Sequence, residues 1–320
     1  MSILETKNLK TYFPVKGGIF HNVRDYVKAV NDVTLTANGG EIVSVVGESG
    51  CGKTTLGLSL LGLTPVTSGE IYLDGNRINI KNSNSWDLLR KDFQIIFQDP
   101  FTSLNPRHTV YRILSEPLLI HNVCSRKNIK DGVAALLEQV GLSPDYMDRF
   151  PHAFSGGQRQ RIAIARSIGV QPKLIVCDEV VSALDVSVQA QIIQLLMELR
   201  KRMGVTLLFI THDLSLVKVI SDRVYVMYLG RVVEQAESDV LFSRPSHPYT
   251  QALISAIPQV DPSMRGKRTI LKGEVPSIMN PPSGCHFHPR CPIAEDRCRK
   301  EEISFYEAGE GHIVRCWKAS

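Results

Sequence analysis

Residues 47–54 combine a residue pattern and a spacing suited to polyphosphate binding. Their sequence, Gly-Glu-Ser-Gly-Cys-Gly-Lys-Thr, matches the Walker A pattern G-x-x-x-x-G-K-[ST]. Glycines let backbone N–H groups approach phosphate oxygens, Lys53 supplies a cation for the β- and γ-phosphates, and the Thr54 hydroxyl is a Mg²⁺ ligand. We therefore predict contacts with a nucleotide from Gly47, Glu48, Ser49, Gly50, Cys51, Gly52, Lys53, Thr54 and Thr55. The chemistry requires no thiol, so Cys51 is interpreted as a small space-filling residue.

A second candidate chemical group follows another apolar segment. Leu174-Ile-Val-Cys177 is followed by Asp178 and Glu179, which is a Walker B arrangement. Asp178 would hold Mg²⁺ through water, and Glu179 would orient or deprotonate the attacking water. Two acids after one strand are otherwise a common solvated strand end. Together with the phosphate loop they favour the catalytic interpretation.

The elements around these residues alternate between strands and helices. Residues 41–46 form a short apolar run typical of a buried parallel strand, and residues 54–61 suit a helix packed on a sheet. Strands are predicted at 173–177, 205–210 and 223–227, with a helix at 187–202. This βαβ pattern predicts a mainly parallel sheet with helices on both faces. Residues 1–36 are predicted to form short strands around a hydrophilic loop, and residues 100–170 to be largely helical.

Composition excludes several classes of protein. The chain has 320 residues, a net charge of +5, 43% hydrophobic and 22% charged residues, so disordered and collagen-like architectures are excluded. The charge is too weak to indicate nucleic-acid binding by itself. No apolar run approaches the ~18 residues that a membrane span needs, so the chain is not itself a pore. The N-terminus lacks the pattern of a secretory signal.

Further motifs, in order along the chain, resemble those of ABC-type ATPases. The stretch Phe154-Ser-Gly-Gly-Gln-Arg-Gln-Arg161 resembles the ABC signature and lies between the Walker A and Walker B motifs. Gln98 resembles the Q-loop glutamine, Asp185 the D-loop aspartate and His212 the switch histidine. Tyr12 resembles the aromatic residue that stacks on adenine, with Phe13 as the adjacent candidate.

The resemblance implies an α/β P-loop NTPase fold. It comprises a RecA-like, mainly parallel sheet core, an antiparallel β subdomain, a helical subdomain at about 100–170 and a small cysteine-rich C-terminal extension. We predict a nucleotide-binding domain over 1–257 and the extension over 258–320. In this family two ATPase domains meet head to tail, and ATP lies between the Walker A motif of one and the signature of the other. Ser155, Gly157 and Gln158 would then contact a partner's nucleotide, because a helix N-terminus favours phosphate.

The resemblance also assigns catalytic roles and partners. Glu179, His212 and Gln98 are the expected catalytic residues, and Thr54, Gln98 and Asp178 the expected Mg²⁺ ligands. The segments 97–107, 146–161, 183–191 and His247-Pro-Tyr-Thr250 look like the peptide-importer branch, and Val181-Ser-Ala-Leu-Asp185 is most similar to its second ATPase subunit. This implies a second, paralogous ATPase subunit, two permease subunits, an extracytoplasmic substrate-binding protein and a place on the cytoplasmic membrane face. Val180 replaces the family's usual proline and removes no catalytic group.

Four of the seven cysteines crowd the last 36 residues. Cys285, Cys291, Cys298 and Cys316 have spacings of neither common ferredoxin nor zinc-ribbon type, so chemistry alone leaves zinc, iron–sulfur and free thiols open. A metal would suit a short tail with few large apolar residues. The resemblance favours a structural [4Fe–4S] cluster, as some peptide-importer ATPases carry. With zinc, His286, His288 or His312 are substitute ligands.

Other functions remain open to test. One is a soluble ABC ATPase of DNA repair or translation, although such proteins usually carry a long coiled coil or two ATPase domains. Another is an interaction module that binds nucleotide without hydrolysing it, which an intact Glu179 and His212 disfavour. Nickel complexes and glutathione are alternative cargoes to di- or oligopeptides.

Overall fold

The computed structural model describes residues 2–17, 22–82, 86, 89–99, 103–258 and 271–318. These residues belong to two compact units that alternate along the chain. We call Asn38–Gly40 together with Asn84–Phe209 the helical unit. We call Ser2–Ala37, Glu41–Ser83 and Ile210–Ser320 the sheet unit. Each unit is described by itself.

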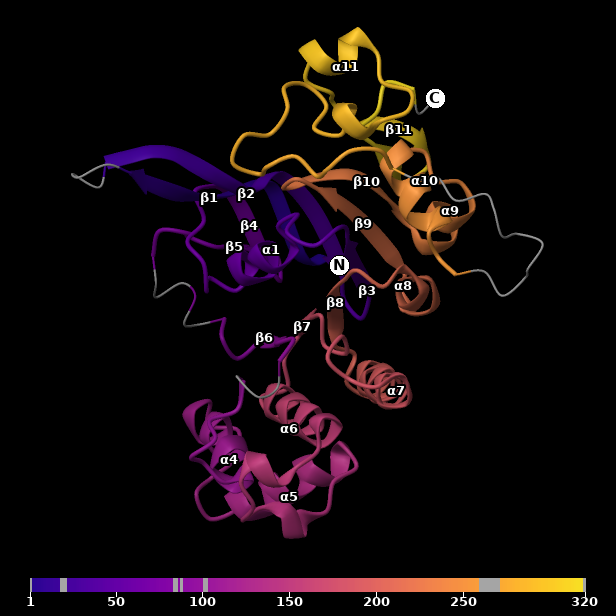
Figure 1. Ribbon diagram of the computed structural model, residues 1–320. Coiled ribbons are helices and arrows are strands. Elements are labelled where there is room, and N and C mark those ends of the chain that lie inside the picture. Colours follow the sequence, from indigo (N-terminus) through magenta and orange to yellow (C-terminus); the bar gives the residue numbers. More distant parts are fainter. Residues whose placement is uncertain are drawn as a thin grey trace. The chain divides into compact units, whose positions relative to one another are not determined.

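Among its described residues, the helical unit contains three strands and most of the long helices. Its α-helices and strands are β6 (Phe93–Ile96), α4 (Val110–Ile120), α5 (Ile129–Gln139), α6 (Gly156–Ile168), β7 (Leu174–Asp178), α7 (Val186–Met203) and the first residues of β8 (Thr206–Thr211). The strands lie in the order β8-β7-β6, and β6 runs parallel to β7. Helices α4, α5 and α6 pack against one another (Figure 1).

Local sequence explains the ends of these helices. The Thr109 hydroxyl accepts a hydrogen bond from the Arg112 N–H and caps α4. Helix α7 ends at Gly204, whose φ of 68° is the left-handed conformation that glycine adopts without strain. Gly169 packs its α-carbon closely against α5, since an added Cβ would lie 2.9 Å from a Leu136 methyl carbon. The predicted helical region at about 100–170 thus contains the packed helices α4 to α6.

The described residues of the sheet unit form strands of two sheets. Its elements are β1 (Ser2–Gly17), β2 (Asn22–Asn38, with Asn38 assigned to the helical unit), β3 (Ile42–Val46), α1 (Lys53–Leu60), β4 (Ser68–Leu73), β5 (Asn76–Arg77), α8 (Leu214–Ile220), β9 (Arg223–Tyr228), β10 (Arg231–Glu237), α9 (Ser238–Ser243), α10 (Pro248–Ser255), α11 (Asp296–Lys300), β11 (Tyr306–Gly309) and β12 (His312–Val314). One sheet has the order β2-β1-β4-β5, with β1/β4 and β4/β5 antiparallel. The other contributes β11-β12-β10-β9-β3, in which β3 and β9 are parallel.

The α/β fold with a parallel core, an antiparallel β part and a helical part is confirmed. The prediction of short strands over 1–36 was wrong, because β1 and β2 have 16 and 17 residues. Polar residues such as Lys16 are tolerated in these strands since their side chains reach solvent. No helix among the described residues is long and apolar enough to cross a membrane.

The C-terminal extension shares the core of the sheet unit. Strand β12 pairs antiparallel with β10, and β11 lies beyond it at the edge of the same sheet (Figure 1). Phe287 is 1% exposed and packs with Tyr228 and Tyr249 in one apolar cluster. The boundary predicted at 257/258 stays a prediction, and residues 259–270 lie outside the described residues.

Candidate nucleotide-binding site

The predicted phosphate loop is a strand–turn–helix in the sheet unit. All residues of β3 are buried, and α1 begins at Lys53 directly after the glycine-rich turn. Gly47 and Gly52 have φ values of 153° and 104°. A Cβ on Gly47 would lie 2.2 Å from the Met227 carbonyl oxygen, and one on Gly52 would lie 1.9 Å from the Ala29 carbonyl oxygen. Neighbouring backbone therefore packs against the loop so closely that only glycine fits.

Lys53 is held inside this loop. Its side chain is 5% exposed, and Nζ donates hydrogen bonds to the carbonyl oxygens of Gly47, at 2.8 Å, and Glu48, at 3.0 Å. Thr54 is exposed and Thr55 half-buried at the start of α1. Cys51 is buried, and burial raises the pKa of its thiol, as expected of a space-filling cysteine.

The two candidate aromatic residues differ in their surroundings. The Tyr12 hydroxyl donates a hydrogen bond of 2.7 Å to Asn31 Oδ1, and burial raises the pKa of Tyr12. Asn31 lies two residues from Ala29, which contacts the phosphate loop. The neighbouring Phe13 has no polar group and is 40% exposed. Stacking uses the face of an aromatic ring, so the hydrogen bond of its hydroxyl is compatible with Tyr12, which is half-buried, as the stacking residue.

His212 lies in the sheet unit between the end of β8 and the start of α8. Its neighbours fix the backbone there. Asp213 N–H donates to the Thr211 hydroxyl oxygen at 3.1 Å, and Asp213 Oδ1 accepts from the N–H groups of Ser215 and Leu216. The His212 side chain is exposed. This N-cap arrangement fixes the backbone next to His212, which directly follows strand β8, and its catalytic role stays a prediction.

In the helical unit, Gln98 and Glu179 are brought together. Gln98 Nε2 donates to Glu179 Oε2 at 2.8 Å and to the Ser182 hydroxyl oxygen at 3.3 Å. The Ser182 hydroxyl in turn donates to the Glu179 carbonyl oxygen at 2.9 Å. Asp178, at the end of β7, is 4% exposed. Gln98, Glu179 and Ser182 therefore form one hydrogen-bonded group that includes a Walker B carboxylate, although Gln98 and Glu179 are 81 positions apart in the sequence.

The backbone at Glu179 is strained. Its φ of 46° is left-handed, which is uncommon for a residue other than glycine, asparagine or aspartate and often marks a functional site. The following Val180 is 2% exposed. The valine that replaces the family's usual proline is therefore a core residue.

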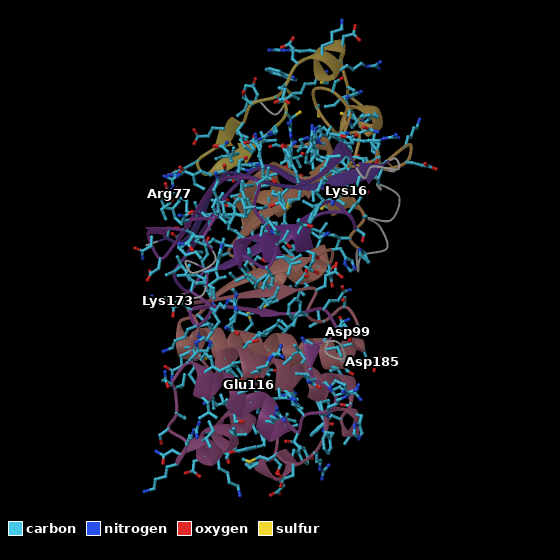
Figure 2. All side chains as sticks on the ribbon, turned by 90° about the vertical axis from the view of Figure 1, so that its left-hand side faces the viewer. Lys16, Arg77, Asp99, Glu116, Lys173 and Asp185 are labelled. Atoms are coloured by element: carbon cyan, nitrogen blue, oxygen red, sulfur yellow. The ribbon has the colours of Figure 1, made fainter. Side chains whose placement is uncertain are left out.

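The predicted signature segment begins helix α6. Ser155 and Gln158 form a capping box: Gln158 N–H donates to Ser155 Oγ, and Ser155 N–H donates to Gln158 Oε1 at 3.1 Å. Gly157 has no room for a side chain, because a Cβ would lie 2.5 Å from a methyl carbon of Val188 in α7. Asp185 precedes α7 and is exposed, and Figure 2 shows it at the margin of the ribbon.

The four C-terminal cysteines are within electrostatic range of one another. Burial, and to a smaller extent the charges of Cys298, Cys291 and Cys316, raise the pKa of Cys285 to about 11. The Cys285 N–H also donates to the Cys298 carbonyl oxygen at 2.8 Å. Among the described residues, however, no three histidine, cysteine or acidic side chains are gathered as a metal-ligand set.

The three nearby histidines each have one ring nitrogen engaged elsewhere. His286 Nδ1 lies 3.3 Å from the Leu229 carbonyl oxygen, and His288 Nδ1 lies 3.0 Å from the Cys285 carbonyl oxygen. His312 Nε2 lies 2.7 Å from Glu234 Oε1, and Glu234 is fully buried. A metal-bound histidine commonly holds its second ring nitrogen in such a contact, so zinc with histidine ligands stays an alternative to the four thiols.

Two residues that contact the phosphate loop were missed by the sequence analysis. Arg290 donates two hydrogen bonds to the Glu48 carboxylate, although the residues are 242 positions apart. The Tyr249 hydroxyl oxygen accepts from the Glu48 N–H at 2.9 Å. No local pattern could indicate either contact. The available signals were an arginine in the predicted extension and a tyrosine in the 247–250 segment that resembles the peptide-importer branch.

Comparison with known proteins identifies the family. A family model described as "ABC transporter" matches residues 30–182, and one described as "Oligopeptide/dipeptide transporter, C-terminal region" matches residues 233–298. The chain is 47% identical to the oligopeptide transport ATP-binding protein AppF of Bacillus subtilis, covering 98% of this chain and 97% of that protein. It is 48% identical to the oligopeptide transport ATP-binding protein OppF of Escherichia coli, covering 99% and 96%.

Solved structures agree with this relationship. cbiO1 from Clostridium perfringens, part of the ABC transporter complex cbiONQ, superposes with a TM-score of 0.65 at 28% identity, covering 76% of this chain and 91% of that one. A dimeric ATP-binding cassette in a post-hydrolysis state with ADP and Pi gives a TM-score of 0.64 at 28% identity, covering 73% and 98%. By sequence along nearly its whole length and by fold, the chain belongs to the family of ATP-binding proteins of oligopeptide and dipeptide ABC transporters.

Proposed function

We propose that the protein is the ATP-hydrolysing subunit of an ABC importer for di- or oligopeptides. The observation that carries this proposal is the phosphate loop, in which a buried Lys53 and two glycines packed against backbone form a preorganised anion site. On nucleotide binding, Lys53 Nζ would exchange its contacts with loop carbonyl oxygens for the β- and γ-phosphates. Tyr12 would stack on adenine, with Phe13 as the adjacent candidate.

The catalytic roles follow from the polar residues at the ends of the strands. Thr54, Gln98 and Asp178 would hold Mg²⁺, which neutralises charge on the β- and γ-phosphates. Glu179 would accept a proton from, or orient, the attacking water, and Gln98 already positions its carboxylate. His212 would contact the γ-phosphate. Catalysis would then arise from positioning and charge stabilisation.

The signature residues supply the reason for a partner. Ser155 and Gln158 satisfy each other in the capping box, so the start of α6 is rigid before any ligand arrives. The N–H groups of Gly156 and Gly157, at the positive end of a helix of 13 residues, would bind the γ-phosphate of a nucleotide held by a second ATPase subunit. Asp185 would lie at that interface. Each chain thus provides half of a site.

The family relationship supports the rest of the assembly. We propose two membrane permease subunits, an extracytoplasmic substrate-binding protein and a paralogous ATPase subunit as partners. The protein would then lie peripherally on the cytoplasmic face of the membrane. Relatives named for oligopeptide and dipeptide transport favour peptides over nickel complexes or glutathione as cargo.

A glutamine at position 179 tests the catalytic assignment. Glu179→Gln keeps the size and hydrogen bonding of the side chain but removes the base. In the assembled transporter we expect ATP to bind while hydrolysis falls by about 10²-fold or more. ATP turnover and retained nucleotide are measured on the same preparation, with the wild-type complex as control. Unchanged hydrolysis in the variant would reject the role of Glu179.

The importer assignment has its own test, which is co-purification with a membrane permease. A protein that purifies without a permease partner would argue against the importer.

We also propose that Cys285, Cys291, Cys298 and Cys316 hold a structural [4Fe–4S] cluster. Four cysteines in the C-terminal extension supply the number of thiolates that such a cluster needs, although no three of them are gathered as a ligand set in the described part of the structure. Iron, zinc and acid-labile sulfide are measured per chain after anaerobic purification. We expect iron with sulfide in the wild type and in Cys124→Ser, and their loss in Cys298→Ser. Zinc without sulfide would contradict the cluster.

A further inference from the structure

Glu48, the second residue of the phosphate loop, is held by three separate contacts. Its N–H donates to the Tyr249 hydroxyl oxygen at 2.9 Å. Its carbonyl oxygen accepts from Lys53 Nζ at 3.0 Å. Its carboxylate accepts from Arg290 Nη1 at 2.7 Å and from Nη2 at 3.0 Å. The backbone and the side chain of one loop residue are therefore both fixed, and two of the three partners come from beyond residue 248.

Arg290 is built into the fold for this contact. Its side chain is 7% exposed, whereas that of Glu48 is 28% exposed. The guanidinium lies over the Tyr228 ring, with its central carbon 5.9 Å from the ring centre, and Nη1 lies 3.5 Å from the Tyr228 hydroxyl. Two parallel N–H···O bonds to a carboxylate give directional as well as electrostatic strength. A partly buried pair with two parallel hydrogen bonds differs from the exposed ion pairs of the extension, such as Arg297 with Glu301.

The negative charge of the Glu48 carboxylate opposes the binding of a triphosphate to the same loop. An unpaired negative charge on the loop would repel the ligand and would be free to take up the loop N–H groups that phosphate needs. Arg290 neutralises this charge and fixes the carboxylate in one direction. Its segment, η4 (His288–Arg290), is anchored by Phe287, which packs on Tyr228 and Tyr249.

We infer that Arg290 is a positioning residue through which the C-terminal extension keeps the phosphate loop competent for ATP. It acts through Glu48 and need not touch nucleotide. The extension then helps to hold the nucleotide site in its binding conformation. The inference rests on the proposed ATP site.

The experiment is a double-mutant cycle in which Arg290 and Glu48 are substituted singly and together in the full chain and the Kd for ATP is measured for each variant. Arg290→Met should raise the Kd for ATP about tenfold, because it leaves a carboxylate unpaired beside the ligand. In a Glu48→Gln background the same substitution should change the Kd by less than about twofold, because no charge remains to be neutralised. Arg290→Lys keeps the charge without the fork and should lie between. Arg297→Met, which removes an exposed pair in the same extension, is the matched control and should bind as the wild type.

Outcomes separate this inference from the ATP site itself. An Arg290→Met protein that binds ATP like the wild type would overturn the inference. An equal loss of ATP affinity from Arg290→Met in the wild-type and Glu48→Gln backgrounds would also overturn it, since Arg290 would then act through the fold alone. Should Arg290→Met fail to fold, Arg290→Lys with and without Glu48→Gln carries the same comparison. Lys53→Ala tests the proposed ATP site itself. Normal ATP binding by Lys53→Ala would reject the phosphate loop as that site. Loss of ATP binding by Lys53→Ala, together with normal binding by Arg290→Met, would reject only the role of Arg290.

Discussion

Two regions of the sheet unit, the phosphate loop and the junction with the C-terminal extension, are stabilised in different ways. The loop takes its shape from consecutive residues, and its critical positions are glycines that meet neighbouring backbone at Met227 and Ala29. The junction depends on side chains from distant segments. Glu234 of β10 accepts hydrogen bonds from the N–H groups of Ser246 and His247 and lies against His312 of β12.

The comparison shows that a local motif can depend on non-local support. The loop presents its N–H groups through backbone geometry, which a short pattern specifies. Its Glu48 is nevertheless fixed by Tyr249 and Arg290, both from the junction side. A change at a loop glycine that packs against backbone should therefore abolish both the fold of the loop and ATP binding, whereas a change in the junction should have a smaller, graded effect.

The largest effect is expected for Gly52→Ala. Gly52 has a φ of 104°, and an added Cβ would lie 1.9 Å from the Ala29 carbonyl oxygen. Backbone atoms cannot rotate away as a flexible side chain can, so we expect a loss of at least about 3 kcal/mol in unfolding free energy and loss of ATP binding. Urea unfolding and equilibrium binding of ATP measure both.

The same loop offers a matched control at Gly50. Its φ of 78° is also left-handed, but nothing lies within 4 Å of the position of an added Cβ. Gly50→Ala should therefore cost only about 1 kcal/mol, the conformational penalty alone. If the two variants lose equal stability, close backbone packing is not what requires glycine at position 52.

The same distinction explains what the sequence could predict. Strand β3, the phosphate loop, β7 with Asp178 and Glu179, and the capped start of α6 were predictable, since each is encoded by adjacent residues. The length of β1 and β2 was not, because polar residues on an exposed strand resemble a loop. The addition of β12 to β10 and the Arg290–Glu48 pair were also out of reach, since long-range pairing depends on the packed fold.

A smaller, pH-dependent effect is expected at the junction, from His247. This side chain is 1% exposed, and burial lowers its pKa to about 3. Its Nδ1 accepts a hydrogen bond from the Tyr249 N–H at the start of α10, so the folded state needs the neutral ring. In the unfolded chain the imidazole regains a pKa near 6.5 and binds a proton below that pH. The unfolded state therefore binds more protons between about pH 6.5 and 3, and stability falls as the pH drops through this range.

The variant His247→Asn separates this titration from other acid effects. Asparagine Oδ1 can accept the same hydrogen bond from Tyr249 but gains no proton. Between pH 7 and 5.5 the wild type should lose about 1 kcal/mol more unfolding free energy than the variant. His152→Asn, which changes an exposed histidine, should follow the wild type. Parallel pH profiles for the wild type and His247→Asn would mean that the junction does not depend on a neutral imidazole, and that its aromatic packing around Phe287 suffices to hold α10 beside the phosphate loop.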